Sequence, residues 1–186
     1  AITLMDSIQT YNGLAHEVTI NTVPTGIRFK TDYYKGNNII SAPVLPGNYQ
    51  VKVTINEPGY EPLLKTASFI IRKAPLDVFA ENAVMNFGDH IPELIYSFSG
   101  FVNGETDSVI TTPPILSLTA ERPLKPGNYP LIPTDGIADN YFFNYIPGTL
   151  TVNPLTIQSL SVSDTFAVYD GQPHLIFVGT TPDSIQ

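Results

Sequence analysis

The sequence predicts an all-β chain of small β-sandwich domains arranged in tandem. Three observations support this prediction: several short stretches alternate apolar and polar residues, 17 Pro and 13 Gly are spread along the 186 residues, and motifs recur at a fixed spacing. Alternation with a period of two buries one face of a pleated strand, and dispersed Pro and Gly interrupt the chain with frequent turns. The recurring motifs divide the chain into repeated units.

Three stretches show the alternation most clearly, with every second side chain placed on one face of the predicted strand. The residues on these faces are Ile27, Phe29, Thr31 and Tyr33, then Tyr49, Val51, Val53 and Ile55, and then Leu94, Tyr96 and Phe98.

Two further stretches need a choice between helix and strand. Residues 63–74 fit a helical stripe as well as a strand, and their β-rich counterpart at residues 148–152 favours a strand. Residues 105–110 carry acidic side chains at a helix start and stop before Pro113 and Pro114, which predicts a short helix of one or two turns.

The repeats fix the predicted domain organisation. The turn motif Tyr11-Asn12-Gly13 recurs as Tyr169-Asp170-Gly171, and later residues follow in the same ungapped register: His16 as His174, Thr22 as Thr180, Pro24 as Pro182 and Ile27 as Ile185. An intervening unit shares Pro-Gly-Asn-Tyr with the first, at residues 46–49 and 126–129. We therefore expect unit one at residues 1–74, unit two at residues 75–154, and a third segment at residues 155–186, the truncated start of a third repeat cut from a longer array.

The fold of each unit is predicted from the number and order of its strands. About seven short strands, with turns every 8–12 residues, favour an Ig-like β-sandwich for unit one. In unit two the order of strand, strand, short helix and three strands fits an Ig-like sandwich or a small β-grasp-like domain equally well.

Composition limits the partners that the chain can have. The formal net charge is −8 and no basic stripe is present, which argues against nucleic acid and anionic membranes as partners. No apolar run reaches about 18 residues, so no membrane insertion of this segment is expected. Ala1 to Asp6 lack the basic and apolar regions of a signal peptide. The chain has no Cys, and therefore no disulfide framework or thiolate site.

One stretch of unit two carries a family resemblance. Phe87-Gly88-Asp89-His90-Ile91-Pro92, residues 98–106, Pro126 to Tyr129 and residues 148–152 resemble the YGX-type MBG repeat of bacterial surface proteins. Phe87 stands where that family prefers Tyr, and His90 where it prefers Pro. The flanking units, with Tyr-Asn-Gly and Tyr-Asp-Gly, resemble the related YDG-like and Ig-like MBG repeats. The resemblance implies extracellular arrays in adhesin-like proteins, generally without an assigned activity.

No group of residues predicts catalysis, a cofactor or a metal site. His16 and His174 are equivalent positions in different units and cannot meet, so we interpret these two and His90 as structural or surface residues. Asp135, Asp139 and Asn140 offer hard oxygen ligands, but their spacing fits no EF-hand loop and favours a polar hairpin turn. There is no Gly-x-Ser-x-Gly elbow. We expect the chain not to be an enzyme.

The aromatic residues are the remaining candidates for binding. Tyr141, Phe142, Phe143 and Tyr145 occupy both faces of one strand, so some are either covered or exposed. Exposed tyrosines can stack on sugars or anchor a protein, and Tyr33, Tyr34 and Tyr60 are the candidate ligand-binding residues. Tyr49 and Tyr129 follow the Pro-Gly turns and are predicted to act as tyrosine corners.

These observations lead to one functional hypothesis and two alternatives. The chain is predicted to be a non-catalytic spacer or stalk of an extracellular or cell-surface bacterial protein, monomeric, with neighbouring repeats as its partners. The alternatives are a binding module for a host glycan or protein, and an accessory region of a secreted carbohydrate-active enzyme. Short junctions at residues 73–76 and 152–155, each with a Pro, predict stiff connections and an elongated shape.

Overall fold

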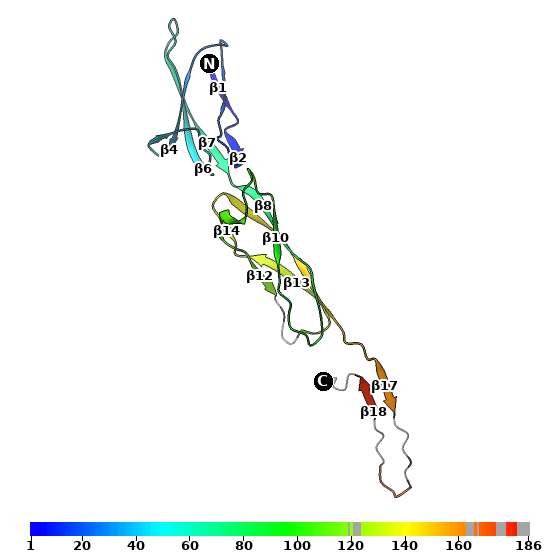
Figure 1. Ribbon diagram of the computed structural model, residues 1–186. Coiled ribbons are helices and arrows are strands. Elements are labelled where there is room, and N and C mark those ends of the chain that lie inside the picture. Colours follow the sequence, from blue (N-terminus) through cyan, green and yellow to red (C-terminus); the bar gives the residue numbers. More distant parts are fainter. Residues whose placement is uncertain (119, 121–123, 163–165, 167, 174–177, 182–186) are drawn as a thin grey trace.

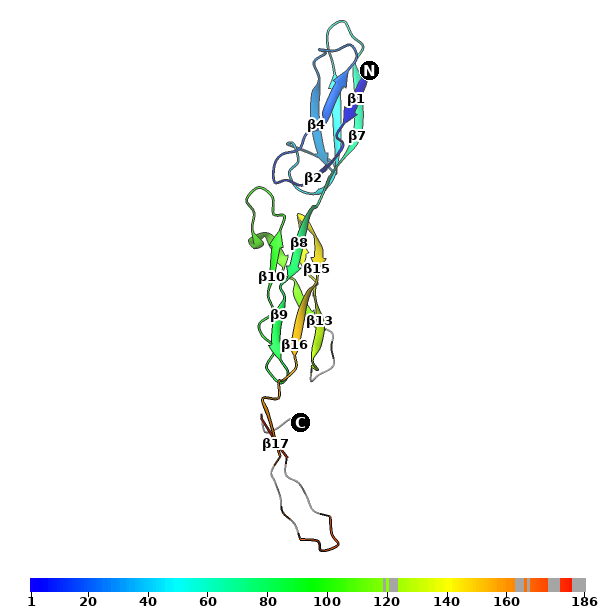
Figure 2. The same ribbon diagram turned by 90° about the vertical axis from the view of Figure 1, so that its right-hand side faces the viewer.

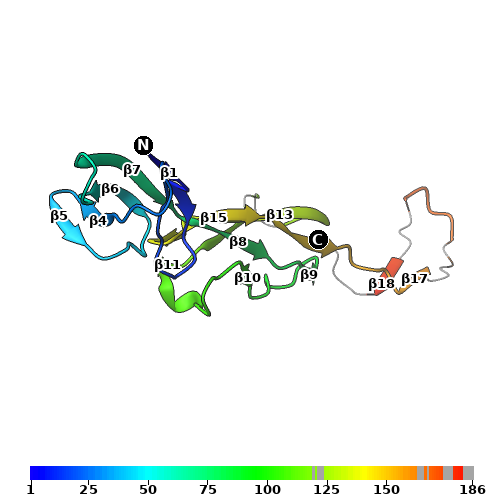
Figure 3. The ribbon, with the colours of Figure 1, turned by 90° about the horizontal axis from the view of Figure 1, so that it is seen from above.

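The computed structural model describes residues 1–118, 120, 124–162, 166, 168–173 and 178–181. The two units and the third segment follow one another along one long axis in two perpendicular views (Figures 1 and 2). Seen from above, β4, β5 and β6 lie at one end and β17 and β18 at the other (Figure 3). The elongated shape expected from the junctions is therefore present.

Unit one is a sandwich of two sheets. The smaller sheet pairs β1 (Ile2–Met5) with β3 (Thr19–Thr22). The larger sheet has the order β2-β7-β6-β4-β5, in which only the β2 and β7 pair is parallel. Its strands are β2 (Ile8–Thr10), β4 (Lys30–Lys35), β5 (Asn38–Ile40), β6 (Gly47–Ile55) and β7 (Leu63–Arg72).

The core of unit one follows the alternation in the sequence. Tyr49, Val51, Val53 and Ile55 of β6 are all at most 5% exposed. Residues 63–72 form a strand, as their counterpart in unit two predicts. The stretch before Tyr33 was predicted incorrectly in part, because β4 begins only at Lys30 and Phe29 is 43% exposed.

Unit two also has two main sheets. One has the order β10-β8-β15, formed by β8 (Ala74–Ala80), β10 (Tyr96–Ser99) and β15 (Tyr141–Ile146). The other has the order β12-β13-β16-β9, formed by β9 (Ala83–Asn86), β12 (Ile115–Leu118), β13 (Gly127–Thr134) and β16 (Gly148–Asn153). A short ladder joins β11 (Ile110–Thr112) to β14 (Ile137–Ala138).

Two segments of unit two pass from one sheet to the other side by side. β8 continues into β9, and β15 continues into β16. β8 pairs with β15 and β9 pairs with β16, and both of these pairs are parallel. At the crossing a Cβ on Gly148 would lie 2.4 Å from the Ala80 carbonyl oxygen, so only glycine permits this close approach.

The short helix predicted in unit two is a single 3-10 turn, η1 (Asp107–Val109), with Thr106 as its N-cap. None of its residues is buried. A β-grasp helix has to cover a sheet, so the two facing sheets make an Ig-like sandwich the better description.

The two predicted tyrosine corners have the same geometry. The Tyr49 hydroxyl donates to the Leu45 carbonyl oxygen at 2.7 Å, and the Tyr129 hydroxyl donates to that of Lys125 at 2.7 Å. Each bond spans four residues, as in a tyrosine corner, and ties the turn to the strand that follows it.

The third segment repeats the local structure of unit one. β17 (Ser159–Val162) pairs with β18 (Val178–Thr181), and the register Leu160↔Thr180 corresponds to Ile2↔Thr22 at the offset of 158 residues that separates Tyr169 from Tyr11. Several residues of the third segment lie outside the part that the structure describes.

The two junctions differ, although the sequence predicted both to be nearly loop-free. Between β7 and β8 there is one residue, Lys73, and Ala74 is buried. Between β16 and β17 there are residues 154–158, all exposed. The prediction for the second junction is wrong, because Pro154 is followed by further unpaired residues before the next strand begins.

Candidate functional site

The most elaborate constellation of side chains lies where unit one meets unit two, and we call it the joint. The buried side chains of unit one and of the adjoining end of unit two form one hydrophobic cluster that includes Tyr11, Ile71, Ala74, Leu76 and Tyr141. The other end of unit two has a separate core around Leu131 and Leu150. The boundary between hydrophobic cores therefore falls inside unit two rather than between the units.

A single carboxylate links the two units within the joint. Glu105 lies in the loop just before η1, and its Oε1 accepts a hydrogen bond from the Tyr11 hydroxyl of unit one at 2.5 Å. Its Oε2 accepts a hydrogen bond from the Tyr141 hydroxyl on β15. The two tyrosine rings meet edge to face, with centroids 5.8 Å apart and an interplanar angle of 88°.

The electrostatics of the joint keep both tyrosines protonated. Burial, followed by the hydrogen bond to Glu105, raises the pKa of Tyr11 to about 12. The same two causes, in the same order, raise the pKa of Tyr141. Both hydroxyls are therefore donors at neutral pH, and Glu105 receives two charge-assisted hydrogen bonds, which are stronger than neutral ones.

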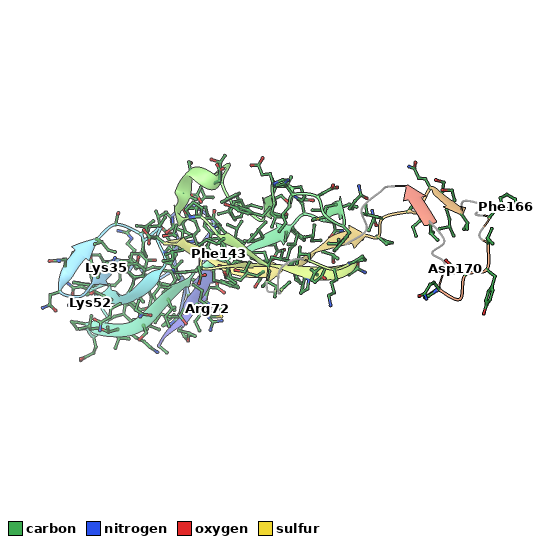
Figure 4. All side chains as sticks on the ribbon, turned by 90° about the horizontal axis from the view of Figure 1, so that it is seen from below. Lys35, Lys52, Arg72, Phe143, Phe166 and Asp170 are labelled. Atoms are coloured by element: carbon green, nitrogen blue, oxygen red, sulfur yellow. The ribbon has the colours of Figure 1, made fainter. Side chains whose placement is uncertain are left out.

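Backbone contacts reinforce the joint. The Ala74 amide donates to the Asn140 carbonyl oxygen at 2.9 Å, and the Lys73 Nζ donates to the Ala138 carbonyl oxygen at 2.8 Å. Within unit one, the Tyr11 amide donates to the Arg72 carbonyl oxygen at 2.8 Å, which holds the tyrosine beside the last residue of β7. Arg72 and Phe143 are labelled in this region (Figure 4).

The turn that follows Tyr11 is shaped to fit unit two. Gly13 has φ of 77°, and a Cβ at this position would lie 2.5 Å from the Asn103 Cβ. The Asn103 Nδ2 donates to the Gly13 carbonyl oxygen at 3.4 Å. Glycine is required here both by the left-handed backbone and by the close approach of the Asn103 side chain.

Sequence reasoning missed the joint. It identified Tyr11 as part of a turn and Glu105 as the start of a helix, with nothing to connect residues 94 positions apart. A usable signal was present in the tyrosine that precedes both Asn12-Gly13 and its repeat Asp170-Gly171, because a turn alone does not need an aromatic residue at that place.

The three tyrosines predicted as ligand-binding residues have different environments. Tyr33 is 6% exposed, packs against Phe69, and accepts a hydrogen bond from the Val18 amide at 3.0 Å. It is a core residue, so the expected exposure of its ring is wrong. Tyr34 is half-buried, and Tyr60 is 50% exposed in the loop between β6 and β7.

The outer face of the larger sheet of unit one carries a shallow depression of about 340 Å³. The cross-strand neighbours Tyr34 and Gln50 lie in it, and Lys52 marks its position in Figure 4. The complete lining is Tyr34, Gly36, Asn37, Gln50, Lys52, Leu64 and Thr66. This surface combines one aromatic ring with several hydrogen-bonding groups, but Tyr33 and Tyr60 do not line it.

Two of the three histidines can be placed. His16 is 5% exposed, its Nδ1 lies 2.5 Å from the Gln9 Oε1, and its Nε2 has no partner among the described residues. Burial lowers the pKa of His16. His90 is exposed, and His174 lies outside the described residues.

The acidic loop of unit two is a turn between strands. Asp135 has φ of 60° and lies between β13 and β14, where its carboxylate accepts a hydrogen bond from the Thr134 hydroxyl at 2.9 Å. The Gly136 amide donates to the Tyr145 hydroxyl at 2.8 Å. Within the described part of the chain, no three His, Asp or Glu side chains gather in a way that could hold a metal ion.

Comparison with known families matches both halves of this architecture. The profile described as MBG domain (YGX type) matches residues 76–151, and the profile described as MBG domain matches residues 1–75. The chain belongs to the MBG domain family. The expected resemblance is confirmed in both units, and the joint connects one MBG repeat to the next.

Other comparisons add little to this assignment. No curated protein matches the chain. Among solved structures, the fibronectin(III)-like modules of Clostridium thermocellum CbhA are similar, with 14% identity over 83% of this chain and 95% of that chain and a TM-score of 0.31. Within the residues that the structure describes, no helix has the length and apolar character needed to cross a membrane.

Proposed function

We propose that these MBG repeats are a non-catalytic spacer that holds neighbouring domains of an extracellular bacterial surface protein in line. The observation that carries this proposal is the joint, in which Tyr11 of one repeat and Tyr141 of the next donate to the same carboxylate of Glu105. A spacer has to fix the orientation of each repeat relative to the next, and this requires contacts between repeats as well as a short linker.

Several features of the joint favour stiffness. One residue separates β7 from β8, and the hydrophobic cluster is continuous across the connection. Bending at Lys73 would expose Ala74 and Leu76 and separate Glu105 from Tyr11. MBG domains are typical of bacterial surface proteins, which supports the proposed location. In this proposal the chain works as a monomer and its partners are the adjacent repeats.

A distance measurement between spin labels tests the spacer proposal. The chain has no Cys, so Thr66→Cys on β7 and Val84→Cys on β9 provide two exposed labelling sites, one in each unit. We expect pulsed electron paramagnetic resonance to give one narrow distance distribution. Glu105→Gln in the same labelled chain should broaden it. A broad distribution in the unaltered chain would contradict the proposal.

A second candidate function is recognition of a host glycan or protein by the depression on the larger sheet of unit one. The observation that favours it is the juxtaposition of the half-buried Tyr34 ring with Gln50 and Lys52 on one open sheet face. Aromatic rings stack on sugars, and neighbouring amides and amines can bond to hydroxyl groups.

A glycan array with the whole chain tests this second candidate. Loss of binding in Tyr34→Ala, with binding retained in Tyr60→Ala, would locate recognition in the depression. The opposite result would locate it in the loop between β6 and β7. If the unaltered chain binds no glycan and captures no host protein, the binding function fails and the spacer function is unaffected.

A further inference from the structure

We propose that the Tyr169-Asp170-Gly171 turn of the third segment is a docking element for a second unit of the YGX type, which it would contact through the loop equivalent to residues 103–105. The inference rests on the proposed spacer function and extends it. It assigns the third segment a specific partner and a specific set of contacts, equivalent to those of the joint between unit one and unit two.

The first argument is that the third segment has the local structure that positions Tyr11. The pairing of β17 with β18 has the register of β1 with β3 at every described pair, from Leu160↔Thr180 to Val162↔Val178. The turn itself is also the same. The Gln172 amide donates to the Asp170 Oδ1 at 2.9 Å, as the Leu14 amide donates to the Asn12 Oδ1 at 2.9 Å.

The backbone of the two turns agrees closely. Gly171 has φ of 75° and Gly13 has φ of 77°. The turn in the third segment therefore has its docking conformation before any partner is present. Such preorganisation lowers the entropy that ordering of a binding element would otherwise cost.

The second argument is the difference in surroundings. Tyr11 is 4% exposed in the joint, whereas Tyr169 is 93% exposed. A Cβ on Gly13 would collide with Asn103, whereas a Cβ on Gly171 would meet no described atom within 4 Å. The third segment presents an aromatic ring and a bare glycine at the surface, which are the two features that unit two covers in unit one. Asp170 lies at the far end of the molecule from Lys35 (Figure 4).

The chemistry of the partner follows from the occupied joint. A tyrosine hydroxyl needs an acceptor when it is buried, and Glu105 supplies one with a negative charge. Because the glycine has no Cβ, a side chain such as Asn103 can pack against it and donate to its carbonyl oxygen. The sequence Asn103-Gly104-Glu105 therefore describes the loop that the turn of the third segment fits. In an array, YDG-type and YGX-type repeats would alternate with the same joint at each step of this kind.

A segment exchange within this chain tests the proposal. Residues 159–181 align without gaps with residues 1–23, so replacing the latter by the former places Tyr169 on the frame of unit one, opposite the native Glu105. With the labels at positions 66 and 84, we expect the exchanged chain to give the same narrow distance distribution as the unaltered chain. Tyr169→Phe or Glu105→Gln in the exchanged chain should broaden it.

Double-mutant cycles provide the quantitative comparison. The coupling between the exchanged Tyr169 and Glu105 should change the unfolding equilibrium constant about tenfold or more, close to the coupling between Tyr11 and Glu105 in the unaltered chain. A folded exchanged chain with a broad distribution and no coupling would overturn the proposal. The spacer function would remain standing in that case, since it is measured on the unaltered chain.

A smaller exchange covers the possibility of misfolding. Asn12→Asp with Leu14→Gln gives unit one the turn sequence of the third segment, and Leu14 is 58% exposed, so the core is left intact. We expect the coupling between Tyr11 and Glu105 to persist in this variant. Its loss, or the failure of both exchanged chains to fold, would show that the two turns are not interchangeable and would overturn the proposal.

Discussion

The two junctions of this chain connect similar pieces in different ways. At the first, one residue joins β7 to β8, and Tyr11, Glu105 and Tyr141 connect the units over a shared core. At the second, residues 154–158 are exposed. Tyr169, the counterpart of Tyr11, lies beyond β17, away from this junction, and is 93% exposed. The comparison teaches that a Pro in the linker does not by itself bring two repeats into contact, and that the side chains that meet at the first boundary do so.

Limited proteolysis should reveal the largest difference between the junctions. A broad-specificity protease is expected to cut within residues 154–158 long before it cuts near Lys73, because cleavage needs an exposed segment with few protecting contacts. Mass spectrometry of early fragments would identify the sites. Cleavage of both junctions at similar rates would break the comparison.

Truncation of the joint tyrosine should have the next largest effect. Tyr141→Ala removes a ring that is 2% exposed and is expected to lower the free energy of unfolding by about 3–5 kcal/mol. Tyr169→Ala is the matched control, and its effect should stay within about 0.5 kcal/mol because its ring is exposed. Urea unfolding monitored by circular dichroism measures both, and equal effects would mean that the buried ring in the joint stabilises the chain no more than an exposed ring does.

Removal of the bridging charge should have a smaller effect. Glu105→Gln leaves two buried hydroxyl donors competing for one neutral acceptor and is expected to cost about 1.5–3 kcal/mol. Asp107→Asn removes an exposed carboxylate two residues away and should change stability by less than about 0.5 kcal/mol. If the two substitutions behave alike, the bridge does not stabilise the joint.

The sequence predicts the strands much better than the joint. Strand β6 follows from alternation alone, since every second side chain from Tyr49 to Ile55 enters the core. The two tyrosine corners follow from a motif whose hydrogen bond is local. By contrast, the bridge between Tyr11 and Glu105 depends on how two units dock, and no periodic pattern encodes a contact of that range.

The errors have the same origin. Tyr33 and Tyr34 were both named as candidate ligand-binding residues, but adjacent residues of a strand face opposite sides, and Tyr33 is the one that enters the core. The second junction was expected to resemble the first because both contain Pro. The contacts that join the two units at the first junction come from side chains outside the junction sequence.

Substitution of Gly13, in the turn that follows Tyr11, separates the cost of backbone strain from the cost of contact with unit two. Gly13→Ala imposes a side chain both at φ of 77° and against Asn103, whereas Gly26→Ala imposes one at φ of 82° with no described atom within 4 Å. The left-handed backbone should lower the free energy of unfolding of each variant by about 1–2 kcal/mol. The contact with Asn103 should lower that of Gly13→Ala further. Equal losses in thermal unfolding would show that the Asn103 loop moves aside at little cost.

The smallest expected effect is a dependence on pH that arises next to the turn that follows Tyr11. His16 is buried with Nε2 unpartnered among the described residues, and burial lowers its pKa below the value of 6.5 expected for the unfolded chain. The unfolded chain therefore takes up the proton first, and the free energy of unfolding should fall as the pH drops below about 6.5, until the folded form is protonated as well. His16→Gln should remove this component of the slope, whereas His90→Gln, at an exposed position, should leave it unchanged. Urea midpoints at pH 8 and pH 5.5 measure it. A slope that His16→Gln leaves intact would assign the acid sensitivity of unit one to other groups.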